Sequence, residues 1–336
     1  MAEASASVPK SENVLIHAGD CAITVLPSFG GKIASIRIGS HELLQTPLAP
    51  IVPRSREMAF DQSDASGWDE CLPSVAACSI STPAGKAEIP DHGDLWRVEW
   101  VKQGTGYRET GAAIPESGGF LKLFGKCFSL PIELERTMHL YQREKGWRLE
   151  LRYRVRNCGK YVVPWSWAAH PLFVCEEGDR IHLPATIHAV RVEGSRGERL
   201  GKSGSSVGWP VAKLTRGETK NLSVVDASDS GVGDKLFAGP LNPAENWCAL
   251  ERASAGLRIG IRFETAAIPY LGLWLCYGGW PDGPGAKQVC VAMEPSTAPV
   301  DSLAVTGRWS RELAPSESFS WAMQVDIQQI ETKTHA

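Results

Sequence analysis

The feature that most limits how this chain can fold is a two-residue alternation of apolar and polar side chains, punctuated by glycine and proline. The segment GWRLELRYRV alternates charged residues with a row of large apolar ones, Trp147, Leu149, Leu151, Tyr153 and Val155. Such alternation predicts a β-strand with one buried face. The preceding segment, ELERTMHLYQ, alternates in the same way, and the residues REKG between the two segments predict a hairpin.

The same pattern returns at residues 257–263 and 321–327, and 33 glycines and 22 prolines punctuate the whole chain. No stretch shows the period of an amphipathic helix over three turns, and no break in composition divides the chain. We therefore predict an all-β sandwich or barrel. It should form a single domain over residues 13–336, preceded by a flexible N-terminal tail at residues 1–12.

Charge and composition exclude several classes of function. The formal net charge is only −3, so the chain offers no basic surface for nucleic acid. It has no apolar run of about 18 residues and no signal-peptide pattern, so we expect no membrane contact and a cytoplasmic location. The nine cysteines are scattered without a CxxC motif, which favours buried, reduced thiols over a metal site or disulfides. The row of arginines at 148, 152 and 154 suggests either a phosphate site or a solvated sheet face, and we favour the solvated face.

Strand parity singles out three polar or aromatic side chains. In PWSWAAHPLF, His170 shares its strand face with small residues, whereas tryptophans occupy the opposite face. Trp274 in LGLWLCY and Glu294 in QVCVAMEP also lie among small residues, with leucines, valines or methionine on the other face. Because protein interiors are close-packed, such small neighbours imply either a covering element or a ligand cavity.

Two loops add further candidates. In SGWDECLPSV, Asp69 and Glu70 are adjacent on extended chain and point to opposite sides, so they are not a catalytic pair, although one of them can bind hydroxyls. His92 lies in a turn-like DHG segment. Tryptophans such as Trp68 and Trp274 suit the apolar face of a sugar ring. No nucleotide, phosphate, metal or nucleophile motif is present, so we predict a neutral carbohydrate ligand and no cofactor or metal.

Five segments in this order resemble the aldose 1-epimerase (galactose mutarotase-like) family: FGGKIASIRIGSHELL, SGWDECLPSV, DHGDLW, WAAHPLF and VAMEPSTAPVDSL. The resemblance spans residues 14 to 328 and implies a β-supersandwich with the sugar in a cleft on one concave sheet. It implies His170 as the catalytic acid, Glu294 as the catalytic base and His92 as a substrate-binding histidine. The resemblance also implies Asp234 in GDKLFAG as a residue that binds sugar hydroxyls.

The chain departs from the family after His170 and Pro171, where Leu172, Phe173 and Val174 replace the usual Tyr-Phe-Asn. The resemblance therefore implies an acid–base pair without fixing galactose or glucose as the substrate. In the expected reaction, Glu294 takes the proton of the C1 hydroxyl while a protonated His170, supported by His92, protonates the ring oxygen.

Three classes of function remain open from the sequence. The first is an aldose 1-epimerase-like enzyme that interconverts α and β anomers, with a hexose-phosphate epimerase as a variant of it. The second is a non-catalytic carbohydrate-binding protein on the same fold. The third is another sugar-active enzyme, such as a hydrolase or lyase, which requires a second carboxylate, for which Asp69 is the candidate. The protein is expected to be a monomer or a homodimer.

Overall fold

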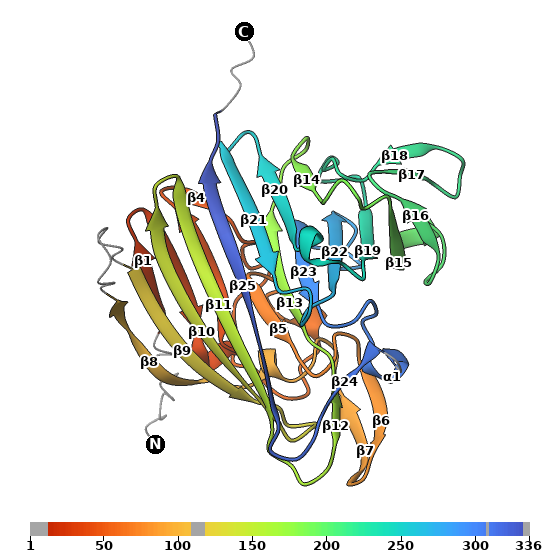
Figure 1. Ribbon diagram of the computed structural model, residues 1–336. Helices are drawn as coiled ribbons and strands as arrows, with labels where there is room; N and C mark the ends of the chain where they lie inside the picture. The colour runs from red at the N-terminus through yellow and green to blue at the C-terminus, as the bar shows by residue number, and fades with distance from the viewer. Residues whose placement is uncertain (1–12, 109–117, 307–308, 332–336) are drawn as a thin grey trace, which may run out of the picture.

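Two large antiparallel sheets face each other in the computed structural model, which describes residues 13–108, 118–306 and 309–331. The predicted tail at residues 1–12 lies outside the described residues. Figure 1 shows β8, β9, β10, β11 and β25 side by side in one layer, with β5, β13 and β23 in the other. The predicted all-β architecture is therefore confirmed.

The first sheet has eleven strands within the described residues and carries the candidate site at its centre. Its path runs β1-β2-β3-β5-β13-β23-β22-β19-β15-β16, and β4 pairs with β3. The strands are β1 (Val14–Ala18), β2 (Cys21–Leu26), β3 (Lys32–Ile38), β4 (His41–Glu42), β5 (Trp68–Cys71), β13 (Ala168–Val174), β15 (Ala189–Ser195), β16 (Ser206–Gly208), β19 (Val232–Ala238), β22 (Tyr270–Tyr277) and β23 (Val289–Ser296).

The second sheet has eight strands in the order β14-β20-β21-β25-β11-β10-β9-β8. They are β8 (Val101–Arg108), β9 (Gly118–Lys126), β10 (Ile132–Arg143), β11 (Gly146–Asn157), β14 (Arg180–His182), β20 (Trp247–Arg252), β21 (Leu257–Phe263) and β25 (Ser318–Gln329). The predicted hairpin is present, since β10 and β11 pair along their whole length and Arg143 lies opposite Gly146.

Short elements decorate the two sheets. Three two-stranded pairs join β6 (Cys78–Thr82) to β7 (Gly85–Ile89), β12 (Val163–Trp165) to β24 (Arg311–Leu313), and β17 (Val211–Lys213) to β18 (Thr219–Asn221). Helical structure is limited, within the described residues, to α1 (Leu303–Thr306) and five 3₁₀ turns: Pro27–Phe29, Phe60–Gln62, Leu95–Arg97, Arg196–Glu198 and Pro243–Glu245. No helix in this part of the chain is long and apolar enough to cross a membrane.

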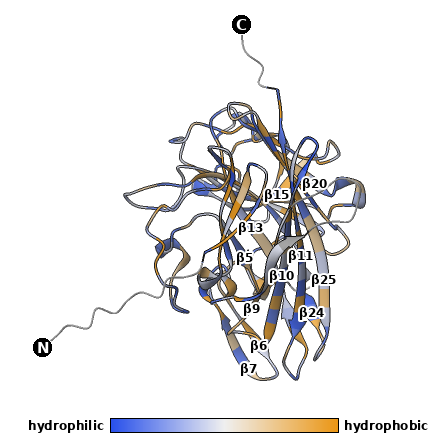
Figure 2. Ribbon diagram, turned by 90° about the vertical axis from the view of Figure 1, so that its left-hand side faces the viewer, coloured by the Kyte–Doolittle hydropathy of each residue, from blue (hydrophilic) through white to orange (hydrophobic). Residues whose placement is uncertain are grey.

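The core lies between the two sheets and follows the predicted alternation. The apolar residues of β11, from Trp147 to Val155, are buried, and the outer face of that strand carries the exposed Arg152 and Arg154. The alternation of hydrophobic and hydrophilic residues along β10 and β11 can be followed in Figure 2. The arginine row is therefore a solvated sheet face, as expected.

One charged pair lies inside this core. Glu70 and Arg136 have no exposed side-chain surface, and Arg136 Nη1 lies 2.9 Å from Glu70 Oε1. Tyr153 Oη and Trp167 Nε1 also donate hydrogen bonds to the Glu70 carboxylate, each at 2.9 Å. Because a buried charge is tolerated only when it is paired and hydrogen-bonded, these donors fix how β5 lies over the second sheet.

Candidate active site

A cross-strand row on the eleven-stranded sheet positions the candidate site. The register that pairs Ala168 with Ser296 and Leu172 with Ala292 puts His170 opposite Glu294. On the far side of β23, Glu294 pairs with Gly272 of β22. Residues directly opposite each other on neighbouring strands have their side chains on the same face. The sheet register therefore brings together residues from distant parts of the chain.

The predicted parity of all three strands is confirmed. Leu271, Leu273 and Leu275 of β22 and Val291 and Met293 of β23 belong to the core between the sheets. Trp274, Cys276, Cys290 and Ala292 pack on the opposite face. The three strands are neighbours in the order β13-β23-β22, so the small residues between them form one floor.

His170 stands on this floor with only 7% of its side chain exposed. Its Nε2 atom lies 3.9 Å from Glu294 Oε1, and its Nδ1 atom has no hydrogen-bond partner among the described residues. Burial lowers the pKa of the imidazole well below its ordinary value, and His92, Lys235 and Lys32 add to this effect. At neutral pH the ring is therefore uncharged, which differs from the imidazolium that we expected from the sequence.

Glu294 lies beneath the cavity and has no exposed side-chain surface. Its Oε2 atom accepts a hydrogen bond from Lys235 Nζ, whereas Oε1 has no hydrogen-bond partner among the described residues. Burial raises the pKa of the carboxyl, and the charge of Lys235 partly offsets this. A Cβ atom on Gly272 would lie 3.2 Å from Glu294 Oε2, so the glycine leaves the space in which Lys235 and Glu294 meet.

Lys235 enters the site from β19, where it pairs with Trp274 of β22. Its Nζ atom lies 3.7 Å from Asp301 Oδ1 as well as against Glu294. Burial by itself lowers the pKa of the amine, but Asp301 and Glu294 outweigh that effect, and the pKa rises above that of an ordinary lysine. The amine is therefore a charged ammonium group held between two carboxylates.

The loop that carries His92 has an unusual backbone. His92 itself has a φ of 60°, and Gly93, with a φ of 70°, follows it. Two sets of hydrogen bonds fix this backbone: Asp94 N donates to Leu72 O, and the Asp94 carboxylate accepts hydrogen bonds from Ser129. His92 Nδ1 lies 2.9 Å from the carboxylate of Asp91, and the His92 ring stacks on Phe60 with a centroid distance of 3.6 Å. These two contacts fix the orientation of the His92 ring and leave its Nε2 atom available to a ligand in the cavity.

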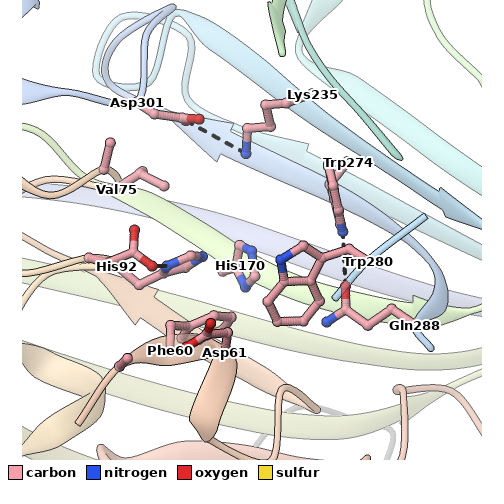
Figure 3. Close-up of a pocket in the computed structure, with 13 residues that line it drawn as sticks. Phe60, Asp61, Val75, His92, His170, Lys235, Trp274, Trp280, Gln288 and Asp301 are labelled. Carbon is pink, nitrogen blue, oxygen red and sulfur yellow. Dashed lines mark hydrogen bonds and ion pairs between the residues drawn. The ribbon is translucent and has the colours of Figure 1, made fainter. Parts of the chain in front are cut away.

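Of these groups, His92, His170, Lys235 and Asp301 line a cavity of about 400 Å³, whereas Glu294 is not among its lining residues. This volume lies within the range of roughly 300–1,000 Å³ that is common for small-molecule sites. Figure 3 shows His170 between His92 and Trp280, with Lys235 and Asp301 on one side and Phe60 and Asp61 on the other. Trp274 donates a 3.0 Å hydrogen bond to Gln288 Oε1 at the edge of the cavity. The lining residues are Ala59, Phe60, Asp61, Val75, Ala76, Asp91, His92, His170, Lys235, Trp274, Trp280, Gln288 and Asp301.

Asp69 adjoins the site without lining the cavity. It pairs with His170 across β5 and β13, so both side chains are on the same sheet face. Its Oδ2 atom binds Lys32 Nζ at 2.6 Å, and its Oδ1 atom, which is buried, has no hydrogen-bond partner among the described residues. Glu70 points into the core, so the two adjacent carboxylates do separate to opposite faces as predicted.

Two other predicted residues lie away from the cavity. Trp68 is fully buried on the core face of β5, one residue out of phase with Asp69. Asp234 lies on the face of β19 opposite to that of Lys235, where its carboxylate accepts hydrogen bonds from Ser195 and Arg199. Strand alternation explains both placements, because a shift of one residue reverses the face.

Sequence reasoning missed Lys235, Asp301, Phe60 and Trp280. Lys235 could have been predicted from the sequence, because strand parity in GDKLFAG places it on the face opposite to Asp234. Phe60 begins a 3₁₀ turn, and Trp280 and Asp301 lie in loops, where no periodicity reveals the direction of a side chain. Among the residues that the structure describes, no group of three or more histidine, cysteine, aspartate or glutamate side chains is arranged to hold a metal ion.

The chain has the fold of the galactose mutarotase-like proteins. The Slr1438 protein from Synechocystis sp. PCC 6803 matches with a TM-score of 0.67 and 16% identity, over 98% of this chain and 100% of that one. A galactose mutarotase related enzyme from Lactobacillus acidophilus matches with a TM-score of 0.63 and 13% identity, over 96% of this chain and 98% of that one.

A GalM/aldose epimerase homologue from C. elegans matches with a TM-score of 0.61 and 11% identity, over 95% of this chain and 99% of that one. No protein-family model matches the sequence, and no curated protein matches it either. At these identities the structural likeness establishes the fold alone, and the activity has to be argued from the site.

Proposed function

We propose that the protein interconverts the α and β anomers of an uncharged aldose by opening and closing the sugar ring. The observation that carries this proposal is the placement of Glu294 Oε1, without a hydrogen-bond partner among the described residues, 3.9 Å from Nε2 of His170, which lines the cavity. Buried polar atoms normally have partners, and those without one often serve a ligand or a reaction. The aromatic rings of Phe60, Trp274 and Trp280 around the cavity suit the apolar face of a sugar ring.

In the proposed reaction, Glu294 acts as the general base. Its carboxylate takes the proton of the C1 hydroxyl, the C1–O5 bond breaks with its electron pair passing to O5, and the aldehyde forms at C1. Rotation about the C1–C2 bond and closure by the reverse steps yield the other anomer. Burial, which raises the pKa of Glu294, makes its carboxylate a stronger base. The neutral imidazole of His170 and the ring of His92 hold sugar hydroxyls.

One observation favours a second candidate function, a carbohydrate-binding protein without catalysis. Glu294 has no exposed surface, and one of its oxygens is bound by Lys235. If a bound sugar does not reach this buried carboxylate, the base takes no part and the cavity serves binding alone. This candidate predicts sugar binding with no faster anomer exchange.

Two-dimensional NMR exchange spectroscopy tests the proposal. The rate of anomer exchange is measured with and without protein for D-glucose, D-galactose, D-mannose, D-xylose and L-arabinose, alongside the affinity of each sugar. The wild-type protein should accelerate exchange of at least one sugar, and Glu294→Gln should lower the catalysed rate by about 10²–10⁴-fold with little change in affinity. Glu251→Gln is the matched control, because Glu251 lies on β20 in the other sheet. Equal rates for the Glu294→Gln variant and the wild type contradict the assignment.

A further inference from the structure

The ring oxygen needs a proton donor, and the site has a group suited to this role besides the two histidines. His170 is uncharged at neutral pH because of its burial, and His92 Nδ1 is engaged with Asp91. Among the described residues that line the cavity, Lys235 is the only lysine or arginine. It is also the group that bonds directly to the proposed base.

We propose that Lys235 is a catalytic residue that donates the proton to the ring oxygen when the sugar opens. This inference rests on the proposed function. It is carried by geometry: the Nζ atom lines the cavity, hydrogen-bonds Glu294 Oε2 and lies 3.7 Å from Asp301 Oδ1. An ammonium group in this position faces the sugar while it remains in contact with the base that takes the other proton.

The proton balance of the step is closed within the pair. As the C1–O5 bond breaks, its electron pair goes to O5, which takes a proton from Lys235 Nζ, while Glu294 Oε1 takes the proton of the C1 hydroxyl. The residues are then a neutral amine and a neutral carboxylic acid. The aldehyde closes by the reverse transfers, in which O5 returns its proton to Lys235 and O1 recovers one from Glu294. The hydrogen bond between Lys235 and Glu294 also allows the proton of the neutral carboxylic acid to pass directly to the neutral amine, which restores the ion pair.

The neighbouring residues fit this role. Asp301 Oδ1 lies 3.7 Å from the ammonium group and, together with Glu294, keeps it charged before the sugar binds. Gly272 leaves the space between β19 and β23 open, because its missing side chain would have met the Glu294 carboxylate. The Lys235 side chain therefore reaches the Glu294 carboxylate across β22.

The test uses Lys235→Arg, Lys235→Ala and Lys213→Ala in the exchange assay, with the sugar that the wild-type protein converts fastest. Arginine keeps the positive charge but does not release its proton, so Lys235→Arg separates charge from acidity. We expect both Lys235 variants to lose about 10²–10⁴-fold in catalysed exchange. Lys213 is an exposed residue of β17, so Lys213→Ala should keep the wild-type rate.

Chemical rescue distinguishes a proton donor from a residue that only keeps Glu294 ionised. Small primary ammonium ions such as methylammonium should restore exchange to Lys235→Ala in proportion to their acidity, whereas tetramethylammonium, which carries no transferable proton, should not. If raising the pH alone or adding tetramethylammonium restores the rate, Lys235 is a positioning residue and the inference is overturned. If Lys235→Ala does not fold, Lys235→Arg still tests the inference, because it keeps the positive charge beside Glu294 and removes only the transferable proton. A wild-type exchange rate in Lys235→Arg would overturn the inference.

The result also separates this inference from the proposed function. If the Lys235 variants keep rates within about threefold of the wild type while Glu294→Gln is inactive, Lys235 is not the donor and the epimerase proposal stands. If the wild-type protein accelerates exchange of none of the sugars, the proposed function and the role of Lys235 fail together.

Discussion

His170 and Glu294 lie directly opposite each other on neighbouring strands, and His170 Nε2 is 3.9 Å from Glu294 Oε1. Each side chain has one buried polar atom without a hydrogen-bond partner among the described residues. A structural pair would be expected to satisfy these atoms, because an unsatisfied buried polar group costs about 1–3 kcal/mol. The relationship therefore suits a site that a ligand completes.

Burial of His170 predicts a pH dependence of stability. The folded-state pKa of His170 is lowered, so the unfolded state binds a proton more readily at pH values between that pKa and the unfolded value near 6.5. The contribution of His170 to the free energy of unfolding is fully present at pH values above the unfolded-state pKa of about 6.5. It is lost as the pH falls from that value towards the folded-state pKa. Thermal unfolding of the wild type and His170→Gln at pH 7.5, 6.5 and 5.5 should show the wild type losing relatively more stability at low pH. A constant difference between the two proteins would contradict the pKa shift.

The buried pair of Arg136 and Glu70 should be sensitive to loss of one partner. Arg136→Met leaves the carboxylate of Glu70 in the core without its cation, which costs about 3–5 kcal/mol in the free energy of unfolding. Denaturant unfolding measures this loss. Arg152→Met, on the solvated face of β11, should change stability by less than about 0.5 kcal/mol. Equal effects from the two substitutions would show that the buried pair is not needed.

Gly93 should be required for the position of His92. Its φ of 70° disfavours a side chain, and a Cβ atom there would collide with the backbone carbonyl of Leu72. Gly93→Ala should cost about 1–3 kcal/mol and lower sugar affinity, because the loop must shift. Gly39→Ala is a matched control, since Gly39 also has a positive φ but has open space around its Cβ position. Sugar binding measured by calorimetry should fall only in the Gly93 variant, and unchanged binding there would separate the loop from the ligand.

Asp234 should matter for stability and not for sugar binding. Its carboxylate accepts hydrogen bonds from Ser195 and Arg199 on the face of β19 away from the cavity. Asp234→Asn should destabilise the protein by about 1–3 kcal/mol and leave sugar affinity at the wild-type level. Calorimetric titration beside a thermal melt checks both outcomes. A clear loss of affinity would restore the sugar-binding role that the sequence suggested.

The charge of the cavity should select against phosphorylated sugars. Asp61, Asp91 and Asp301 line it, and its lysine is already paired with carboxylates. D-glucose 6-phosphate should therefore bind roughly tenfold more weakly than D-glucose at low salt. Added salt screens the repulsion and should reduce this difference in affinity. Competition titrations at two ionic strengths measure the difference. Tighter binding of the phosphate would favour the hexose-phosphate epimerase that the sequence left open.

Much of the fold followed from local patterns. Alternation along residues 147–155 correctly predicted both the buried face of β11 and its hairpin with β10. Parity also placed His170, Trp274 and Glu294 on strand faces with small neighbours, and separated Asp69 from Glu70. These inferences hold because the side-chain direction of a strand reverses at every residue, whatever the rest of the chain does.

Which of these faces meet depends on the order of the strands in the sheet. The order β5-β13-β23-β22-β19 brings together residues from five separate segments, and only this order makes Lys235 a neighbour of Glu294. It also sends Trp68 into the core and Asp234 to the opposite face. The charge state of His170 was decided in the same way, by the depth of its burial and the cations around it. Strands and their faces could be predicted from the sequence because they depend on neighbours along the chain, whereas contacts, burial and proton affinity depend on neighbours in space.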